Sequence, residues 1–337
     1  MRSSRSLFVR SSVGFLVAAL SVAIIGWGFL RSSTASGASS AGHKVTIAML
    51  AGLANPFQSD VLSGVQSIAK ADNATVKYYN YNDDSLTEAS DVSDIIVSKP
   101  DLVLYGVSNS SVSLANFKRL KQAGIPVVCF DVCLEPNVEK TYAHGFVTSN
   151  NQYIGNITGT LAATYIKQKL KGSATVAFIT CNTESVCQTR FAAQQAALKA
   201  VKVMEVANEV EIDPSAAQSA AEDILVAHKG LDMIITDGLS ETEAAAAAVS
   251  DLKDHTVVFG MDITPSIARD LLAPDGPLQA AVGQNGVKIG QLAATIGLGV
   301  LAGKNPATWQ VTVPGKLYLR SDPAGVKAYL TSEGAKA

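Results

Sequence analysis

Short apolar, β-branched segments alternate with helix-length segments from residue 45 to residue 302 of this 337-residue chain. Nearly continuous apolar strands separated by helices are typical of parallel sheets that helices cover on both faces. The expected strands span residues 45–50, 76–81, 102–106, 127–131, 145–149, 176–180, 203–210, 233–237, 257–261 and 278–283. About ten strands are many for one compact sheet, so the pattern predicts an α/β protein with two doubly wound lobes.

Residues 1–41 have the features of an N-terminal signal peptide or anchor. Three arginines precede an uncharged apolar run over residues 13–30, and small residues follow at 33–41. A basic start, an apolar core and a small-residue stretch are typical of a secretory signal. The apolar run is longer than the ~7–15 residues of most signal cores and approaches the ~18 residues that span a bilayer, so an uncleaved anchor is the alternative. Both alternatives predict that the rest of the chain is exported and lies outside the cytoplasm.

The charge of the chain is unevenly distributed. The whole chain has a formal net charge of −2, but residues 1–41 contain four arginines and no acidic residue, so the remainder carries −6. A mildly acidic protein lacks the basic excess of most nucleic-acid-binding proteins. We therefore expect no nucleic-acid partner.

Four cysteines lie in two close pairs, Cys129 with Cys133 and Cys181 with Cys187. An exported protein can retain disulfides, so two local bridges are one interpretation and four free or buried thiols are the other. The spacings are not of the C-x-x-C type and no histidine lies beside either pair. We therefore expect no metal site.

Polar residues follow the expected strands where each strand ends. Asp131, Asp237 and Asp262 each end an apolar strand. An aspartate in this position often caps the following helix. Ligands of doubly wound sheets, however, bind beyond the carboxyl ends of the strands, so three such carboxylates favour one shared cleft. The same loops carry Asn55, Asn150, Arg190 and Gln284.

This set of side chains suits a small neutral sugar or polyol. Carboxylates accept hydrogen bonds from vicinal hydroxyls, and amides and a guanidinium donate them. An aromatic ring among Phe57, Tyr105 and Phe130 in the same loops can cover a C–H face. Three carboxylates against one arginine make an anionic ligand unfavourable. Two lobes can also close over a ligand by hinge motion.

Motifs of catalysis and of nucleotide binding are absent from the sequence. The stretch 297–304 resembles a P-loop but has Leu298 where a glycine is needed, and Asn305 replaces the required serine or threonine. There is neither an H-E-x-x-H nor a G-x-S-x-G motif. We expect a binding protein without a cofactor, and a glycosidase with paired carboxylates is the enzymatic alternative.

Seven segments follow one another in a fixed order: KVTIAMLAGLANPF (44–57), AGIPVVCFD (123–131), TSNNQYIGNITG (148–159), TRFAAQQAAL (189–198), MIITDG (233–238), VVFGMD (257–262) and AVGQNGVKIG (281–290). In this order they resemble the type I periplasmic sugar-binding proteins of ABC transporters, in particular the ribose-binding-protein-like solute-binding components. The resemblance implies two Rossmann-like lobes joined by a three-strand hinge. It implies one lobe from residues 44–149 plus 285–312 and another from 150–284 plus 313–330.

The resemblance also implies a periplasmic location, a sugar buried between the lobes and a membrane permease as partner. We expect the protein to be a monomer. The implied ligand contacts are Asn55, Phe57, Gln58, Asp131, Arg190, Asp237, Met261, Asp262 and Gln284. Gln58 and Met261 stand where the family commonly has aromatic residues, and Val132 stands where it commonly has arginine. These departures indicate a pentose other than ribose, a polyol or a smaller sugar. A membrane-anchored sugar-sensing ectodomain or co-receptor is the alternative to a soluble carrier.

Overall fold

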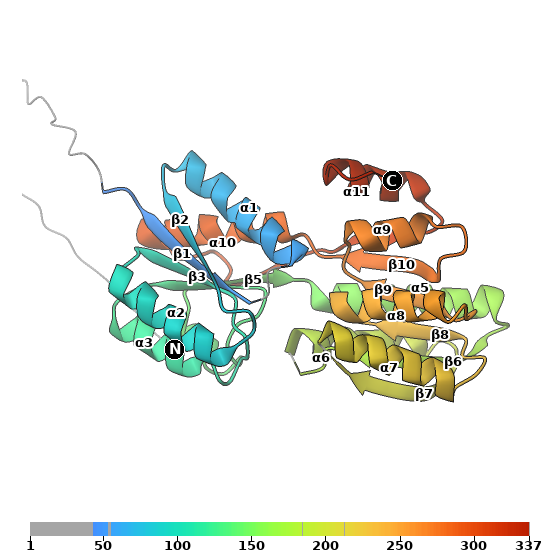
Figure 1. Cartoon of the computed structure of the whole chain (residues 1–337). Coiled ribbons are helices and arrows are strands. Elements are labelled where there is room, and N and C mark those ends of the chain that lie inside the picture. The colour runs from blue at the N-terminus through green and yellow to red at the C-terminus, as the bar shows by residue number, and fades with distance from the viewer. Residues whose placement is uncertain (1–42, 53–54, 184, 212, 337) are drawn as a thin grey trace, which may run out of the picture. The chain divides into compact units, whose positions relative to one another are not determined.

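The computed structural model describes residues 43–52, 55–183, 185–211 and 213–336 (Figure 1). The predicted signal peptide or anchor over residues 1–41 lies outside these residues. Within the described part of the chain, no helix has the length and apolar character needed to cross a membrane.

The first sheet contains six parallel strands in the order β11-β5-β4-β3-β1-β2. Two helices, α1 and α10, pack on one face, and α2 and α3 pack on the other, while the short α4 precedes β5. The strands are β1 (Thr46–Ala51), β2 (Thr75–Asn80), β3 (Leu102–Tyr105), β4 (Val127–Phe130), β5 (Phe146–Ser149) and β11 (Gln310–Val313). The helices are α1 (Pro56–Ala71), α2 (Ser85–Ser98), α3 (Leu114–Gln122), α4 (Glu139–Tyr142) and α10 (Gly286–Leu301).

The second sheet has the order β12-β10-β9-β8-β6-β7, in which β12 runs antiparallel to β10 and the other pairings are parallel. Helices α5 and α6 cover one face, and α7, α8, α9 and α11 cover the other (Figure 1). The strands are β6 (Ser173–Thr180), β7 (Lys202–Val210), β8 (Met233–Thr236), β9 (Val257–Met261), β10 (Leu278–Gly283) and β12 (Lys316–Leu319). The helices are α5 (Asn151–Lys169), α6 (Ser185–Leu198), α7 (Pro214–Ala227), α8 (Leu239–Asp251), α9 (Pro265–Leu272) and α11 (Pro323–Ser332).

These two sheets confirm the predicted α/β fold with two doubly wound lobes. Each expected strand is present, and β11 and β12 are additional. They lie on either side of Pro314 and Gly315, and their sequences, QVTV and KLYL, contain polar residues and are partly exposed. They therefore lack the continuous apolar run by which the other four-residue strands were expected. The chain passes between the sheets after β5, after β10 and between β11 and β12, so three crossovers join the lobes.

In each lobe, an aspartate carboxylate accepts a hydrogen bond from a backbone N–H group of the first strand. The Thr46 N–H donates to Asp101 Oδ2 at 2.7 Å in the first lobe, and the Thr175 N–H donates to Asp232 Oδ2 at 2.7 Å in the second. Both aspartates lie just before the neighbouring strand of the sheet. They satisfy a backbone donor at the sheet end that lies opposite the predicted ligand site.

Glycines allow the helices beside the site to approach closely. A Cβ atom at Gly155 would lie 2.1 Å from the Arg190 carbonyl oxygen, and one at Gly159 would lie 2.6 Å from the Gln194 carbonyl oxygen. A side chain at either position would push α5 and α6 apart, because the interior is close-packed. These two glycines therefore set the distance at which α6 holds Arg190.

Candidate ligand-binding site

Seven of the residues predicted from the sequence line one cavity of about 670 Å³. The cavity lies at the carboxyl ends of the strands and draws residues from both lobes, and its volume is that of a small-molecule site. The seven residues are Asn55, Phe57, Gln58, Asp131, Arg190, Asp262 and Gln284. The first four belong to the first lobe, the next two belong to the second, and the last lies on the crossover after β10.

Asp131 and Asp262 occupy equivalent places, directly after β4 and β9. Both have a φ of 61°, in the left-handed region. The backbone N–H of Asp131 still donates to the Val147 carbonyl at 2.9 Å, and that of Asp262 donates to the Val282 carbonyl at 3.1 Å. Aspartate tolerates left-handed backbone better than most residues with a Cβ atom. The strand ladder thus continues to the aspartate, and the chain then turns sharply where the carboxylate meets the cavity.

Arg190 is 4% exposed and is held by three hydrogen bonds. Its Nε donates to Asn151 Oδ1 at 2.7 Å, its Nη1 donates to the Asp237 carbonyl at 3.1 Å, and its Nη2 donates to Gln284 Oε1 at 3.1 Å. These acceptors lie at the start of α5, after β8 and after β10, so separate elements fix the guanidinium plane. A guanidinium carries more N–H groups than these bonds use, so donors remain for a ligand.

Gln284 connects the site to two crossovers. Its Oε1 also accepts a hydrogen bond from the Ser149 hydroxyl at 2.6 Å, and its Nε2 donates to Asp262 Oδ1 at 3.0 Å. Ser149 ends β5, where the first crossover begins, and Gln284 follows β10, where the second begins. One side chain therefore belongs to the cavity wall and also ties neighbouring hinge segments together.

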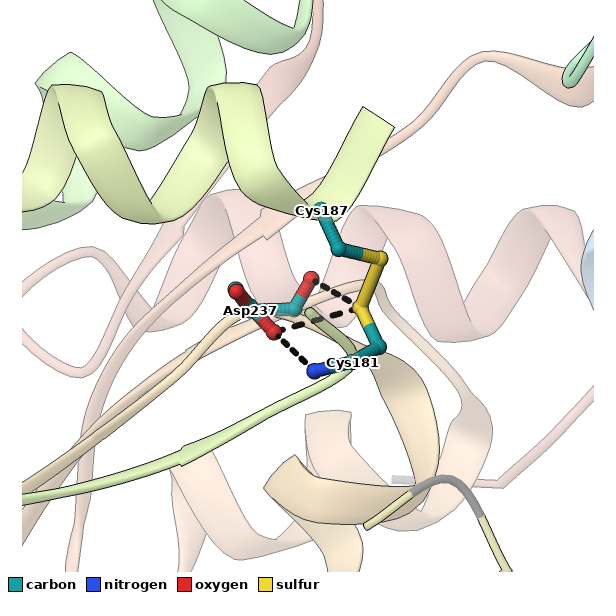
Figure 2. Close-up of side chains that lie close together, drawn as sticks. All are labelled: Cys181, Cys187 and Asp237. Atoms are coloured by element: carbon teal, nitrogen blue, oxygen red, sulfur yellow. Dashed lines mark hydrogen bonds between the residues drawn. A yellow bond between two sulfur atoms is a disulfide. The ribbon is translucent and has the colours of Figure 1, made fainter. Parts of the chain in front are cut away.

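Two of the predicted ligand contacts, Asp237 and Met261, do not line the cavity. Asp237 is fully buried, and its Oδ1 accepts a hydrogen bond from the Cys181 N–H at 2.8 Å (Figure 2). Met261 is also fully buried and packs with Ile154 and Val282. Asp237 supports the arginine through its carbonyl, and Met261 fills the core beneath the cavity.

A sequence model of the periplasmic binding protein domain matches residues 47–305. The chain belongs to the periplasmic binding protein family. This confirms the family predicted from the sequence. Members of this family bind solutes and are not enzymes, which decides against the glycosidase alternative.

Similar proteins extend over most of this periplasmic binding protein. The ABC transporter periplasmic-binding protein YphF of Escherichia coli (strain K12) is 25% identical over 272 residues, which are 79% of this chain and 83% of the relative. The ribose import binding protein RbsB of Bacillus subtilis (strain 168) is 26% identical over 256 residues, 75% of this chain and 80% of the relative.

Solved structures share the fold. The binding protein of the arabinose ABC transporter from Shewanella sp. ANA-3, bound to arabinofuranose, has a TM-score of 0.76 at 15% identity, covering 86% of this chain and 97% of its own. A solute binding protein from Bacillus halodurans C-125 with bound myo-inositol has a TM-score of 0.73 at 16% identity, covering 87% and 99%. Identities this low support the common fold alone.

The structure adds two acidic residues that the sequence did not single out. Glu241 and Glu243, in the first turns of α8, also line the cavity of this binding protein. Glu241 is 2% exposed, whereas Glu243 is half-buried and accepts a hydrogen bond from the Thr264 hydroxyl at 2.7 Å. Both glutamates lie only a few residues after the end of β8. This short distance from a strand end is the sequence signal that could have indicated them.

Burial raises the pKa of the acids in the cavity. It raises the pKa of Asp131 to about 6, where the charge of Asp262 adds to the effect and Arg190 opposes it. It also raises the pKa of Glu241 to about 8, again with Asp262 adding and Arg190 opposing. The pKa of Asp262 itself is raised from the usual range by burial. The protonation of this cavity therefore changes around neutral pH.

Each lobe carries a disulfide close to a charged residue that lines the cavity. The Cys129–Cys133 disulfide brackets Asp131, and the Cys181–Cys187 disulfide joins the loop after β6 to the first turn of α6, one turn before Arg190 (Figure 2). In the second lobe Asp237 connects the disulfide to the arginine. Its side chain accepts a hydrogen bond from the Cys181 N–H, and its backbone carbonyl accepts one from Arg190. Both disulfides therefore restrain loops that carry the site.

The second disulfide belongs to a group of side chains close enough together to hold a metal ion, where the sequence analysis expected no metal site. A sulfur atom from each of Cys181 and Cys187 and a carboxylate oxygen of Asp237 lie within 4.8 Å of one another. The two sulfur atoms are bonded to each other, so neither offers the thiolate that binds a metal. We assign this cluster a structural role.

Proposed function

We propose that this protein captures a monosaccharide or a polyol in the cavity and delivers it to the permease of an ABC transporter by an open–closed hinge motion. The network of Arg190, Gln284 and Asp262 carries the proposal, because it links the cavity wall to the hinge. Carboxylates, carboxamides and a guanidinium suit vicinal hydroxyls, and Phe57 offers a ring for a C–H face. The name of the ribose import binding protein from Bacillus subtilis, a similar protein, supports a sugar as the class of ligand.

A thermal-shift screen of pentoses, hexoses and polyols tests this proposal, followed by calorimetry on each hit. A ligand at ~100 times its Kd stabilises the folded protein by about 2.7 kcal/mol, which a melting curve detects easily. A saturable stabilisation by one of these compounds supports the proposal. No stabilisation by any of them contradicts it.

Export through the N-terminal segment, and action as a soluble monomer in the periplasm, are parts of the same proposal. N-terminal sequencing of the exported protein tests them, because a start near residues 35–43 supports the soluble carrier. A retained apolar run over residues 13–30 supports the anchored sugar-sensing ectodomain or co-receptor instead. Sedimentation of the purified protein tests the monomer.

A further inference from the structure

The cavity contains more acidic than basic side chains. Asp131, Glu241, Glu243 and Asp262 all line it, whereas Arg190 is the one basic side chain among the described lining residues. Three of these acids come from the second lobe, two of them on α8. A solute that fills the cavity therefore enters a surrounding of net negative charge.

The acids have neutral hydrogen-bond partners. Asp131 Oδ2 accepts from the Gln58 side chain at 3.3 Å, and Asp262 Oδ1 accepts from Gln284 at 3.0 Å. Arg190 donates to two amide-type side chains and a backbone carbonyl, and no ion pair joins it to a carboxylate within the described residues. Burial of a carboxylate without an ion-pair partner is unfavourable. The described residues supply no cation that pairs with these acids, so a positively charged ligand would provide the missing counter-charge.

A second observation points to a missing donor. Gln58 is 7% exposed and lines the cavity, and its Nε2 is committed to Asp131. Its Oε1 is buried and has no hydrogen-bond partner. A buried acceptor of this kind needs a donor, and none of the neighbouring described groups provides one. Acceptors thus outnumber donors at the cavity surface.

We propose that the captured solute carries a protonated amine, as an amino sugar or an aminocyclitol does, and that Glu241 and Asp262 supply its counter-charge. This inference rests on the proposed function and names the substrate class of the same cavity. An ammonium group donates three hydrogen bonds and accepts none, which matches the surplus of acceptors. Hydroxyl groups alone could donate to these acceptors but would leave the negative charge unbalanced. The neutral solute expected from the sequence is revised accordingly, since Glu241 and Glu243 were not part of that prediction.

Calorimetry at pH 7 on matched pairs of solutes tests the inference. The pairs are glucosamine with glucose, galactosamine with galactose, and scyllo-inosamine with scyllo-inositol, each with its N-acetyl derivative as an uncharged nitrogen control. We expect one amine to bind at least about 10-fold more tightly than both of its neutral counterparts. Neutral partners that bind equally well or better overturn the inference and leave the proposed function intact. Binding of no compound in any pair overturns the inference, and the screen of pentoses, hexoses and polyols then decides the proposed function separately.

Proton release gives a second readout that does not depend on a variant. Glu241 faces Asp237 after β8, Asp262 after β9 and Arg190 on α6, and burial keeps its pKa near 8. An ammonium beside it would favour the carboxylate, so the carboxyl would lose its proton to the buffer on binding. Binding enthalpies of the amine in buffers of different ionisation enthalpy should show this release, and those of a neutral sugar should not. If binding of the amine at pH 7 releases no proton to the buffer, the role of Glu241 is contradicted.

A pair of charge-matched variants isolates the carboxylate. Glu241→Gln keeps the shape of the side chain and should remove most of the advantage of the amine over its neutral partner. Glu205→Gln on β7 removes an equal charge from an exposed position outside the cavity and should leave that advantage unchanged. Equal loss in both variants, or an unchanged advantage in Glu241→Gln, overturns the assignment. Melting curves confirm that both variants are folded.

Discussion

The two lobes share one architecture but hold their charged cavity-lining residues in different ways. In the first lobe, Gln58 is the one hydrogen-bond partner of the Asp131 side chain among the residues that the structure describes. In the second lobe Arg190 is fixed by Asn151, the Asp237 carbonyl and Gln284, which reach it from three elements. The comparison shows that two lobes with the same fold contribute unequally to the hydrogen-bond network of the cavity. The second lobe and the crossovers contain the preorganised part, and the first lobe completes the wall.

The largest expected effect is that of removing the arginine. Arg190→Ala deletes a buried guanidinium and leaves its acceptors without donors, so we expect a loss of ligand affinity of about 100-fold or more. Arg119→Ala is the matched control, because Arg119 bonds to the Ala89 carbonyl and the Ser93 hydroxyl on α2 and does not line the cavity. Unchanged affinity in Arg190→Ala, measured by calorimetry, would contradict the unequal division between the lobes.

The two equivalent aspartates allow a direct comparison of the lobes. Asp131→Ala should weaken binding by about 10-fold to 100-fold, and Asp262→Ala should weaken it more, since Asp262 is also tied to Gln284. Each variant places alanine at a φ of 61°, whereas Asp131→Gly relieves that strain. Asp131→Gly should therefore be more stable than Asp131→Ala by about 1 kcal/mol, with the same loss of affinity. Equal affinities for both alanine variants would make the lobes equivalent.

The disulfides distinguish the lobes by smaller effects. Replacement of either pair by serines should lower the free energy of unfolding by about 2 kcal/mol, as expected for short closed loops. Asp131 keeps its place without the disulfide, because its N–H and carbonyl are bonded to Val147 and Thr148. The first turn of α6 depends on Cys181–Cys187, so only that variant should also lose affinity, by several-fold. An equal loss of affinity in both variants would refute this asymmetry.

The smallest expected effect is the pH dependence of stability. Burial raises the pKa of Glu241 to about 8 from its ordinary value of 4.5, so the folded protein binds more protons than the unfolded chain between these values. Stability contributed by the protonated form is therefore lost as pH rises. The free energy of unfolding without ligand should fall by about 1–2 kcal/mol from pH 5 to pH 7, and by less in Glu241→Gln. Chemical denaturation at each pH measures this, and a rise instead of a fall would be incompatible with the buried acid.

The sequence predicted much of the site because the ends of the apolar strands can be recognised in it. Asp131 and Asp262 follow apolar strands, and ligands of such sheets bind beyond those ends. Asp237 follows a strand in the same way, yet it is not among the residues with positive φ, and its carboxylate turns to Cys181. The local turn of the backbone decided which aspartates reach the cavity, and composition and spacing do not encode it.

Glu241 and Glu243 escaped prediction for a different reason. They lie within a helix, where acidic residues near the N-terminus usually interact with the helix dipole or with solvent. Their place in the cavity depends on how α8 packs against β8 and β9, which is a long-range property of the second lobe. Sequence patterns describe individual elements well, and they describe the angles between elements poorly.

Gln284 belongs to the cavity wall and to a crossover at once. Under the proposed hinge motion, the atoms that recognise the solute also set how often the empty protein visits its binding-competent conformation. A substitution near this residue could raise the apparent affinity simply by raising that population, with no new contact to the solute. A carrier must also release what it captures, so a variant that binds more tightly by this route would deliver its cargo more slowly.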